Sequence, residues 1–334
     1  MRAAHCMVCV AVAALALPAA APAASILIVN NDGAGEGFND LAPRAPVPGN
    51  PGVTLGQQRL NVFNAAAAVW GTILKSSVQI RVASQFNPLF CDASSALLGS
   101  AGANTFFRDY TGRPVAATWY AVAEANSHFN ADLDPGVNDI TAQFNSFLDG
   151  GVCLGGATWW YGIGSPPVGN TIDLFTTVLH ELAHGLGNLT IYDPGDGSKA
   201  GGFDDAYLRL LRDESPGENW STMTNAERFA SQTDTGNVSW IGSNVNNAND
   251  GFSAGVNGFN RLLIYAPSPH EPGSSISHWA TGVTPNELME PFIENGTNDY
   301  ITYRLMKDIG WSVNLIFKDG FRSGNDNFWS STSP

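Results

Sequence analysis

The chain has 334 residues, of which 30 are acidic and 16 are basic, so its formal net charge at neutral pH is -14. A charge of this sign repels phosphate and excludes nucleic acid as the expected partner, and the acidic residues are scattered rather than gathered into a tail. The length allows one large domain or two small ones. We find neither an internal repeat nor a low-complexity linker to divide it, and we expect a monomer.

The first 23 residues are typical of a secretory signal peptide. Arg2 precedes an apolar run over residues 7–17, and the small residues at 19–24 place the expected cleavage after Ala23. The run is too short to span a bilayer comfortably, and no later segment approaches the roughly twenty apolar residues that spanning needs. We therefore expect a secreted or periplasmic protein with no stable membrane insertion.

Hydrophobic periodicity predicts the elements of the first half of the mature chain. We expect a first strand at residues 26–29, a long helix at 55–74 and an alternating strand at 78–82. Further short strands are expected at residues 118–123 and 158–161. This order indicates a helix packed on a sheet, hence an α+β fold.

Two of the four cysteines, Cys6 and Cys9, leave with the signal peptide. Cys91 and Cys153 remain, and in an oxidising compartment the default interpretation is one disulfide between them. The alternative is a cysteine that blocks a metal to keep an enzyme latent, but nothing in the sequence around either residue favours it.

The most informative stretch is residues 180–184, with the sequence His-Glu-Leu-Ala-His. A helix is predicted here because apolar residues recur at helical period, with Asn170 or Thr171 as its cap and Gly185 and Gly187 as its stop signals. The recurring apolar positions are Ile172, Phe175, Val178, Leu179, Leu182 and Leu186.

Two histidines four apart on a helix face the same way, so His180 and His184 can bind one zinc ion. Glu181 follows the first ligand directly and can take a proton from a water activated by that ion. The alternative, without a metal site, is a surface helix with two solvated histidines and a glutamate. The helical context favours the zinc site.

A catalytic zinc usually takes three protein ligands, so one more donor is needed. His128, His270 and His278 are the remaining histidines of the mature chain. A carboxylate is the other option, since a helix expected at residues 203–213 carries Asp204, Asp205 and Asp213. Spacing alone does not choose among these six residues.

Residues 180–187 resemble the zinc motif of the metzincins, whose glycine, here Gly187, lets the chain turn toward a third histidine. The compact motif expects that histidine three residues after the glycine, where this chain has Thr190. The leishmanolysin-like branch has a long insertion there, followed by a histidine before a tryptophan and then by a Glu-Leu-Met segment. His278-Trp279 and residues 287–289 are similar to that arrangement, and residues 300–311 resemble the closing helix of the same branch.

The resemblance implies that His278 is the third ligand, that Met289 is the methionine of the turn beneath the zinc, and that the substrate is an extended polypeptide. Some metzincins add a tyrosine as a further zinc or oxyanion partner. Tyr300 or Tyr303 could serve, although we expect both at core or helix positions. A specificity pocket is expected near residues 289–298, with Pro291, Phe292 and Ile293 in its lining.

The implied fold is a twisted, mostly parallel sheet over a zinc-binding helix. Its parts would be an upper catalytic subdomain at residues 24–187, an insertion at 188–277, a lower subdomain at 278–315 and a tail at 316–334. The tail is similar to short tails of exported proteins of Gram-negative bacteria, which favours a bacterial source.

Calcium is a further candidate ligand, because Asp193 with Asp196 and the stretch at residues 246–250 group carboxylates and amides. Neither reproduces a full calcium loop, and such clusters are usually turns. Two other functions stay open beside a zinc endopeptidase: a zinc hydrolase of a non-protein amide, such as a cell-wall component, and a non-catalytic binding protein. The intact Glu181 argues against the second.

Overall fold

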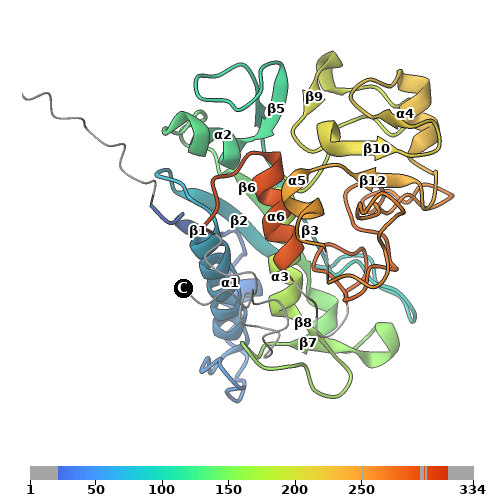
Figure 1. The fold of residues 1–334 in the computed structure, drawn as a ribbon. Coiled ribbons are helices and arrows are strands. Elements are labelled where there is room, and N and C mark those ends of the chain that lie inside the picture. The colour runs from blue at the N-terminus through green and yellow to red at the C-terminus, as the bar shows by residue number, and fades with distance from the viewer. Residues whose placement is uncertain (1–21, 250, 294–296, 298, 315–334) are drawn as a thin grey trace, which may run out of the picture.

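The computed structural model describes residues 22–249, 251–293, 297 and 299–314. Its main sheet has four strands in the order β1 (Ile26–Asn30), β2 (Ile80–Asn87), β6 (Ile140–Asn145) and β3 (Gly99–Ala103). The first three are parallel, and β3 joins the edge of β6 in the antiparallel direction. The fold is therefore mixed α+β, with a mostly parallel sheet and an antiparallel edge strand (Figure 1).

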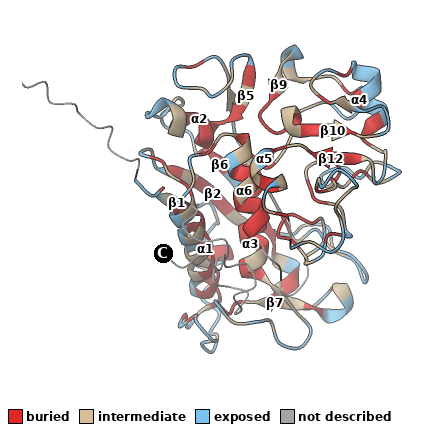
Figure 2. Ribbon diagram, viewed as in Figure 1, coloured by how far each residue is buried: buried red, intermediate tan, exposed pale blue. Residues whose placement is uncertain are grey.

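Two helices lie against this sheet. The long helix α1 (Leu55–Ile73) packs on β1 and on α3 (Leu174–Gly185), and α3 packs in turn on β3 and β6. Trp70 of α1 is fully buried and donates its indole N–H to the Leu179 carbonyl of α3 at 3.1 Å. Buried residues line the inner faces of these elements (Figure 2), so α3 packs against both a helix and the sheet.

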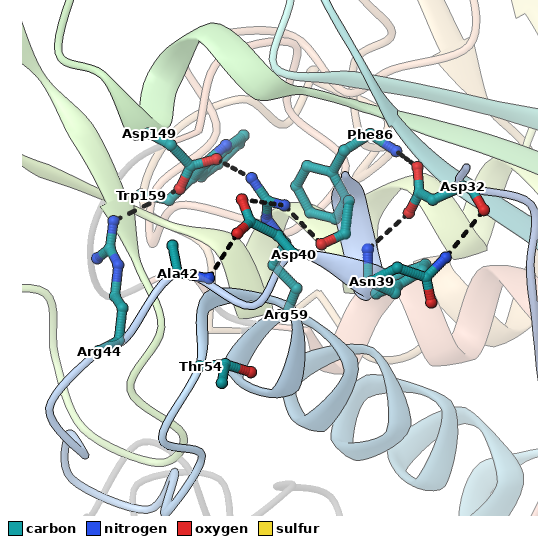
Figure 3. A network of polar contacts seen from close by, with 12 residues as sticks. Asp32, Asn39, Asp40, Ala42, Arg44, Thr54, Arg59, Phe86, Asp149 and Trp159 are labelled. Carbon is teal, nitrogen blue, oxygen red and sulfur yellow. Dashed lines mark hydrogen bonds and ion pairs between the residues drawn. The ribbon is translucent and has the colours of Figure 1, made fainter. Parts of the chain in front are cut away.

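A buried arginine fixes the segment that connects β1 to α1 (Figure 3). The guanidinium of Arg59 on α1 pairs with the Asp149 carboxylate, donates to the Gly37 carbonyl at 2.6 Å and lies 4.3 Å from the centre of the Phe86 ring. Arg44 approaches the same carboxylate at 3.7 Å. One side chain thus joins α1, the connecting segment, β2 and the turn after β6.

The turns after β2 and β6 are joined by the disulfide expected from the sequence. Cys91 and Cys153 are bonded with their Cα atoms 5.7 Å apart. Two short 3-10 helices, η2 (Ser146–Asp149) and η3 (Leu154–Gly156), flank Cys153. The covalent link therefore ties together the turns at one end of the main sheet.

Smaller elements lead into the helix of interest. The 3-10 helix η1 (Gly37–Asn39) precedes α1, β4 (Phe106–Phe107) pairs with β5 (Thr118–Ala121), and β7 (Thr158–Trp160) pairs in parallel with β8 (Thr171–Asp173), which runs directly into α3. The strand expected at 118–123 is shorter, because the chain turns into helix α2 (Val122–Phe129). The strand expected at 78–82 begins at Ile80 and continues to Asn87.

Residues 188–277 carry their own small sheets on one side of the molecule (Figure 1). Strands β10 (Leu211–Asp213), β11 (Glu218–Asn219) and β12 (Val238–Trp240) pair in antiparallel fashion, and β9 (Asp204–Asp205) extends the β4–β5 pair. The other elements of the segment are η4 (Ala200–Gly202), η5 (Leu208–Leu210), α4 (Asn225–Ser231) and α5 (Ser243–Asn246).

The helix expected at residues 203–213 is wrong. The Asp205 carboxylate accepts the backbone N–H groups of Tyr207 and Leu208 at 3.0 and 2.7 Å. An aspartate that bonds its own downstream backbone competes with the hydrogen bonds of a helix. Other backbone groups of this segment are used in strand pairing, since β9 pairs with β5 and β10 pairs with β12.

The last described helix, α6 (Tyr300–Ile309), lies close to α5 and ends two residues before the expected boundary. Gly310 ends it with φ of 137°. Trp311 then donates its indole N–H to the Leu186 carbonyl at 2.8 Å, which docks the chain against the end of α3.

Within the described residues, no helix combines the length and apolar character needed to cross a membrane. Nearly all of the expected signal peptide and the tail at 316–334 lie outside those residues.

Candidate metal centre

Helix α3 has well-formed ends. Its cap is Asp173, whose carboxylate accepts the Phe175 N–H at 3.1 Å, rather than Asn170 or Thr171. At the other end Gly187 adopts φ of 114°, and its N–H donates to the His184 carbonyl at 3.0 Å. The following N–H, of Asn188, donates to the Ala183 carbonyl at 2.9 Å. This pair of bonds is a Schellman motif, which reverses the chain directly after the second histidine.

Three imidazoles converge beside this helix end. The Nε2 atom of His180 lies 3.2 Å from that of His184 and 3.1 Å from that of His278, and the last two are also 3.1 Å apart. A tetrahedral zinc with bonds of about 2.0–2.1 Å separates its ligand atoms by about 3.3 Å. The spacing therefore fits one small divalent cation, and these three residues could hold it.

The opposite ring nitrogens fix the tautomers. The Nδ1 atoms of His180, His184 and His278 lie 2.7, 2.8 and 2.7 Å from backbone carbonyls, which only accept hydrogen bonds. Each Nδ1 therefore carries the proton, and each Nε2 directs a lone pair at the other two. Three facing lone pairs repel one another, whereas a cation between them would be bound. The carbonyls belong to Leu288, Asn188 and Ser274.

Burial keeps the three rings neutral. Desolvation, reinforced by the neighbouring His184, lowers the pKa of His180 to about 3. Desolvation also lowers the pKa of His184 to about 4 and that of His278 well below its ordinary value. Neutral imidazole is the form that binds a metal, so the site needs no proton loss at pH 7.

Glu181 directly follows His180 on helix α3, and it is 7% exposed. Burial raises its pKa to about 8, and a hydrogen bond with the Ala101 backbone of the edge strand β3 opposes that rise. A carboxyl whose pKa lies near the working pH is suited to taking and returning a proton. A cation nearby would lower this pKa and favour the base form.

The segment at residues 287–290 bonds one of the three histidines directly and the neighbour of another. The Leu288 carbonyl orients His180, and the fully buried Met289 accepts the Trp279 N–H at 2.8 Å through its carbonyl. The residue bonded by Met289 directly follows His278. Residues 288 and 289 are therefore bonded to His180 and to the residue after His278.

The other candidate ligands are engaged elsewhere. His128 bonds the Tyr110 hydroxyl at 2.8 Å and the Gly310 carbonyl at 3.0 Å, and His270 lies 3.4 Å from the Tyr192 hydroxyl. The three aspartates are also occupied: Asp204 pairs with Lys199, Asp205 accepts from Thr190, and Asp213 accepts from Ser215.

The two tyrosines lie in helix α6 and are both buried. The Tyr303 hydroxyl donates to Asp299 at 2.6 Å, and its ring packs edge-on against Trp70. The Tyr300 ring lies 4.8 Å from the Arg304 guanidinium. These are the core and helix positions expected from the sequence.

The calcium candidates form turns. The carboxylates of Asp193 and Asp196 accept the N–H groups of Gly195 and Ser198, both at 2.8 Å. Among the residues that the structure describes, His180, His184 and His278 are the only group of histidine, cysteine or acidic side chains gathered for a metal. Asp250 of the second stretch lies outside the described residues.

Of the expected pocket residues, Phe292 is 60% exposed and contacts Tyr265 edge-on, with ring centres 6.4 Å apart. The Tyr265 N–H donates to the His278 carbonyl at 2.8 Å. Phe292 therefore packs against a residue whose backbone is bonded to that of the third histidine, and the sequence did not indicate Tyr265. Part of the expected pocket, residues 294–296 and 298, lies outside the described residues.

No protein family, curated protein or solved structure matches the chain. The assignment of the site therefore depends on its own geometry and chemistry.

Proposed function

We propose that the chain is a secreted or periplasmic zinc endopeptidase of the leishmanolysin-like branch of the metzincins. The observation that carries the proposal is the convergence of three neutral imidazole Nε2 atoms at 3.1–3.2 Å, with the carboxyl of Glu181 on the same helix. Three histidines with one open position is the ligand set of a catalytic rather than a structural zinc. The disulfide is compatible with an oxidising compartment.

In this proposal His180, His184 and His278 hold the zinc ion. When bound there, zinc supplies the Lewis acidity that activates water and polarises a carbonyl. Glu181 accepts the proton of the attacking water and passes it to the leaving amine, so that no covalent link to the protein forms. Its buried position supports this role, because a raised pKa makes the carboxylate a stronger base.

The edge strand β3 is the proposed binding surface for an extended polypeptide. It pairs with β6 on one side, and its Ala101 backbone is bonded to Glu181. The space around Gly102 is open, since a Cβ placed there would meet nothing within 4 Å. A peptide added along this edge would therefore lie next to the base, and such pairing reads backbone more than side chains.

Casein and purified cell-wall material are the two substrates that test the proposal. We expect the zinc-loaded protein to degrade casein, a chelator to stop the reaction and added zinc to restore it. Digestion of wall material with casein left intact would favour a cell-wall amidase instead. Zinc binding without hydrolysis of either substrate would favour a non-catalytic binding protein.

A further inference from the structure

The two ends of the segment at residues 188–277 are joined by a side-chain hydrogen bond. Asn188 donates its side-chain amide to the Ser277 carbonyl at 2.9 Å, across 89 residues of chain. The side chain is completely buried. Asn188 is the first residue of this segment and Ser277 is the last, so a single bond joins its two ends.

Asn188 also belongs to the surroundings of the second histidine. Its carbonyl accepts the Nδ1 proton of His184 at 2.8 Å, and its N–H completes the Schellman motif that ends α3. Ser277, which its side chain holds, directly precedes His278. One residue therefore orients one imidazole through its backbone and anchors the chain that presents another.

This link matters because His278 is not on the helix. His180 and His184 are four apart on α3, which fixes their relative position, whereas His278 follows His184 by 94 residues. A metal site needs its ligand atoms held within about 0.5 Å of the productive geometry. Groups that orient ligands without touching the metal typically contribute 10–100-fold to metal affinity.

We propose that Asn188 is a positioning residue that sets His278 against the two histidines of α3. The inference rests on the metal centre of the proposed function. The side chain of Asn188 acts through the backbone of residue 277 and does not bind the ion. Removal of its amide leaves the carbonyl that orients His184 in place, so the defect falls on the third ligand alone.

Asn249 offers a matched control in the same segment. It is also buried, and it donates its side-chain amide to the Asn260 carbonyl at 2.8 Å. In both residues the amide oxygen finds no hydrogen-bond donor among the described residues. Asn249→Ala therefore removes the same kind of bond without touching the chain next to a histidine of the site.

The experiment measures zinc affinity by competition with a chromophoric chelator, and the visible absorption of the Co²⁺-substituted protein, for wild type, Asn188→Ala, Asn188→Asp and Asn249→Ala. We expect both Asn188 variants to bind zinc about 10–100-fold more weakly and to shift the Co²⁺ spectrum. Asn249→Ala should match wild type in both. Asn188→Asp keeps the volume of the side chain and removes its amide N–H groups, so it can replace Asn188→Ala in the comparison with Asn249→Ala if Asn188→Ala does not fold.

Wild-type affinity and spectrum in the Asn188 variants would overturn the inference and leave the metal centre intact. An equal loss in Asn249→Ala would also overturn it, because the effect would then be one of general stability. A wild-type protein that binds no metal would overturn the inference together with the metal centre. Loss of peptide hydrolysis plays no part in the readout.

Discussion

The Nε2 atoms of His184 and His278 lie 3.1 Å apart although 94 residues separate them in the chain. The intervening segment folds into its own small sheets and returns its last residue to the end of helix α3, where Asn188 holds it. A long segment between two of the three histidines is therefore compatible with a compact site, because its ends meet.

Removal of His278 should weaken metal binding strongly. We expect His278→Ala to lower zinc affinity by more than the roughly 100-fold that loss of an orienting group can cost, because a ligand itself is lost. His270→Ala is the matched control, since that ring contacts Tyr192 rather than the three histidines. Competition titration with a chelator measures both. Equal affinities in the two variants would contradict the ligand set.

The metal-free protein should lose stability when the pH falls below 6.5. The pKa of His180 is about 3 and that of His184 about 4 in the folded protein, so the unfolded chain, with ordinary histidines near 6.5, binds more protons at pH 5. Stability is therefore present above 6.5 and falls with pH, by about 2 kcal/mol per histidine between pH 7 and pH 5.

Denaturant unfolding of the metal-free protein at the two pH values measures this change. In His278→Asn the loss between pH 7 and pH 5 should be smaller than in wild type, because burial also lowers the pKa of His278 and this histidine is gone. An unchanged loss would show that His278 titrates normally in the folded protein.

The disulfide should stabilise the fold through the loop it closes. Cys91 and Cys153 are 62 residues apart, and closure of a loop of this length typically contributes about 2–4 kcal/mol. The double variant Cys91→Ser/Cys153→Ser should unfold at a lower denaturant concentration by that amount. Each single variant, Cys91→Ser or Cys153→Ser, should be destabilised to the same extent as the double variant, because either change removes the disulfide. A double variant as stable as wild type would mean that the link adds nothing to the fold.

The Arg59 ion pair should be costly to break from one side. Arg59→Met leaves the carboxylate of Asp149 without its main partner, and such a loss typically costs about 3–5 kcal/mol. Arg59→Met/Asp149→Asn should recover part of the loss, because the unpaired charge is gone. Thermal or denaturant unfolding tests both. A cost below about 1 kcal/mol for the single variant would contradict a buried pair.

The sequence predicted the elements whose pattern is local. Helical period located α1 and α3 to within a few residues, and short β-rich runs located β1 and β7, whereas α6 was expected only from the resemblance. The prediction failed at residues 203–213, where the hydrogen bonds of Asp205 compete with a helix. Periodicity does not register such bonds.

The candidate site, like the fold, has a part that the sequence predicted locally and a part that it did not. His180, Glu181 and His184 follow from one helical motif, whereas His278 needed the resemblance because spacing alone left six candidates. The carbonyls of Leu288, Asn188 and Ser274 that orient the rings carry no sequence signal, since every residue has a carbonyl. Only the folded backbone reveals them.

The proposed peptidase mechanism is tested most sharply by the rate of peptide hydrolysis of Glu181→Gln compared with wild type at equal, near-stoichiometric zinc content. We expect the variant to bind zinc as well as wild type and its kcat to fall by about 10²–10⁴-fold, because the base is lost while the three proposed ligands remain. Hydrolysis at the wild-type rate by the zinc-loaded variant would contradict the proposed role of Glu181 and, with it, the peptidase mechanism.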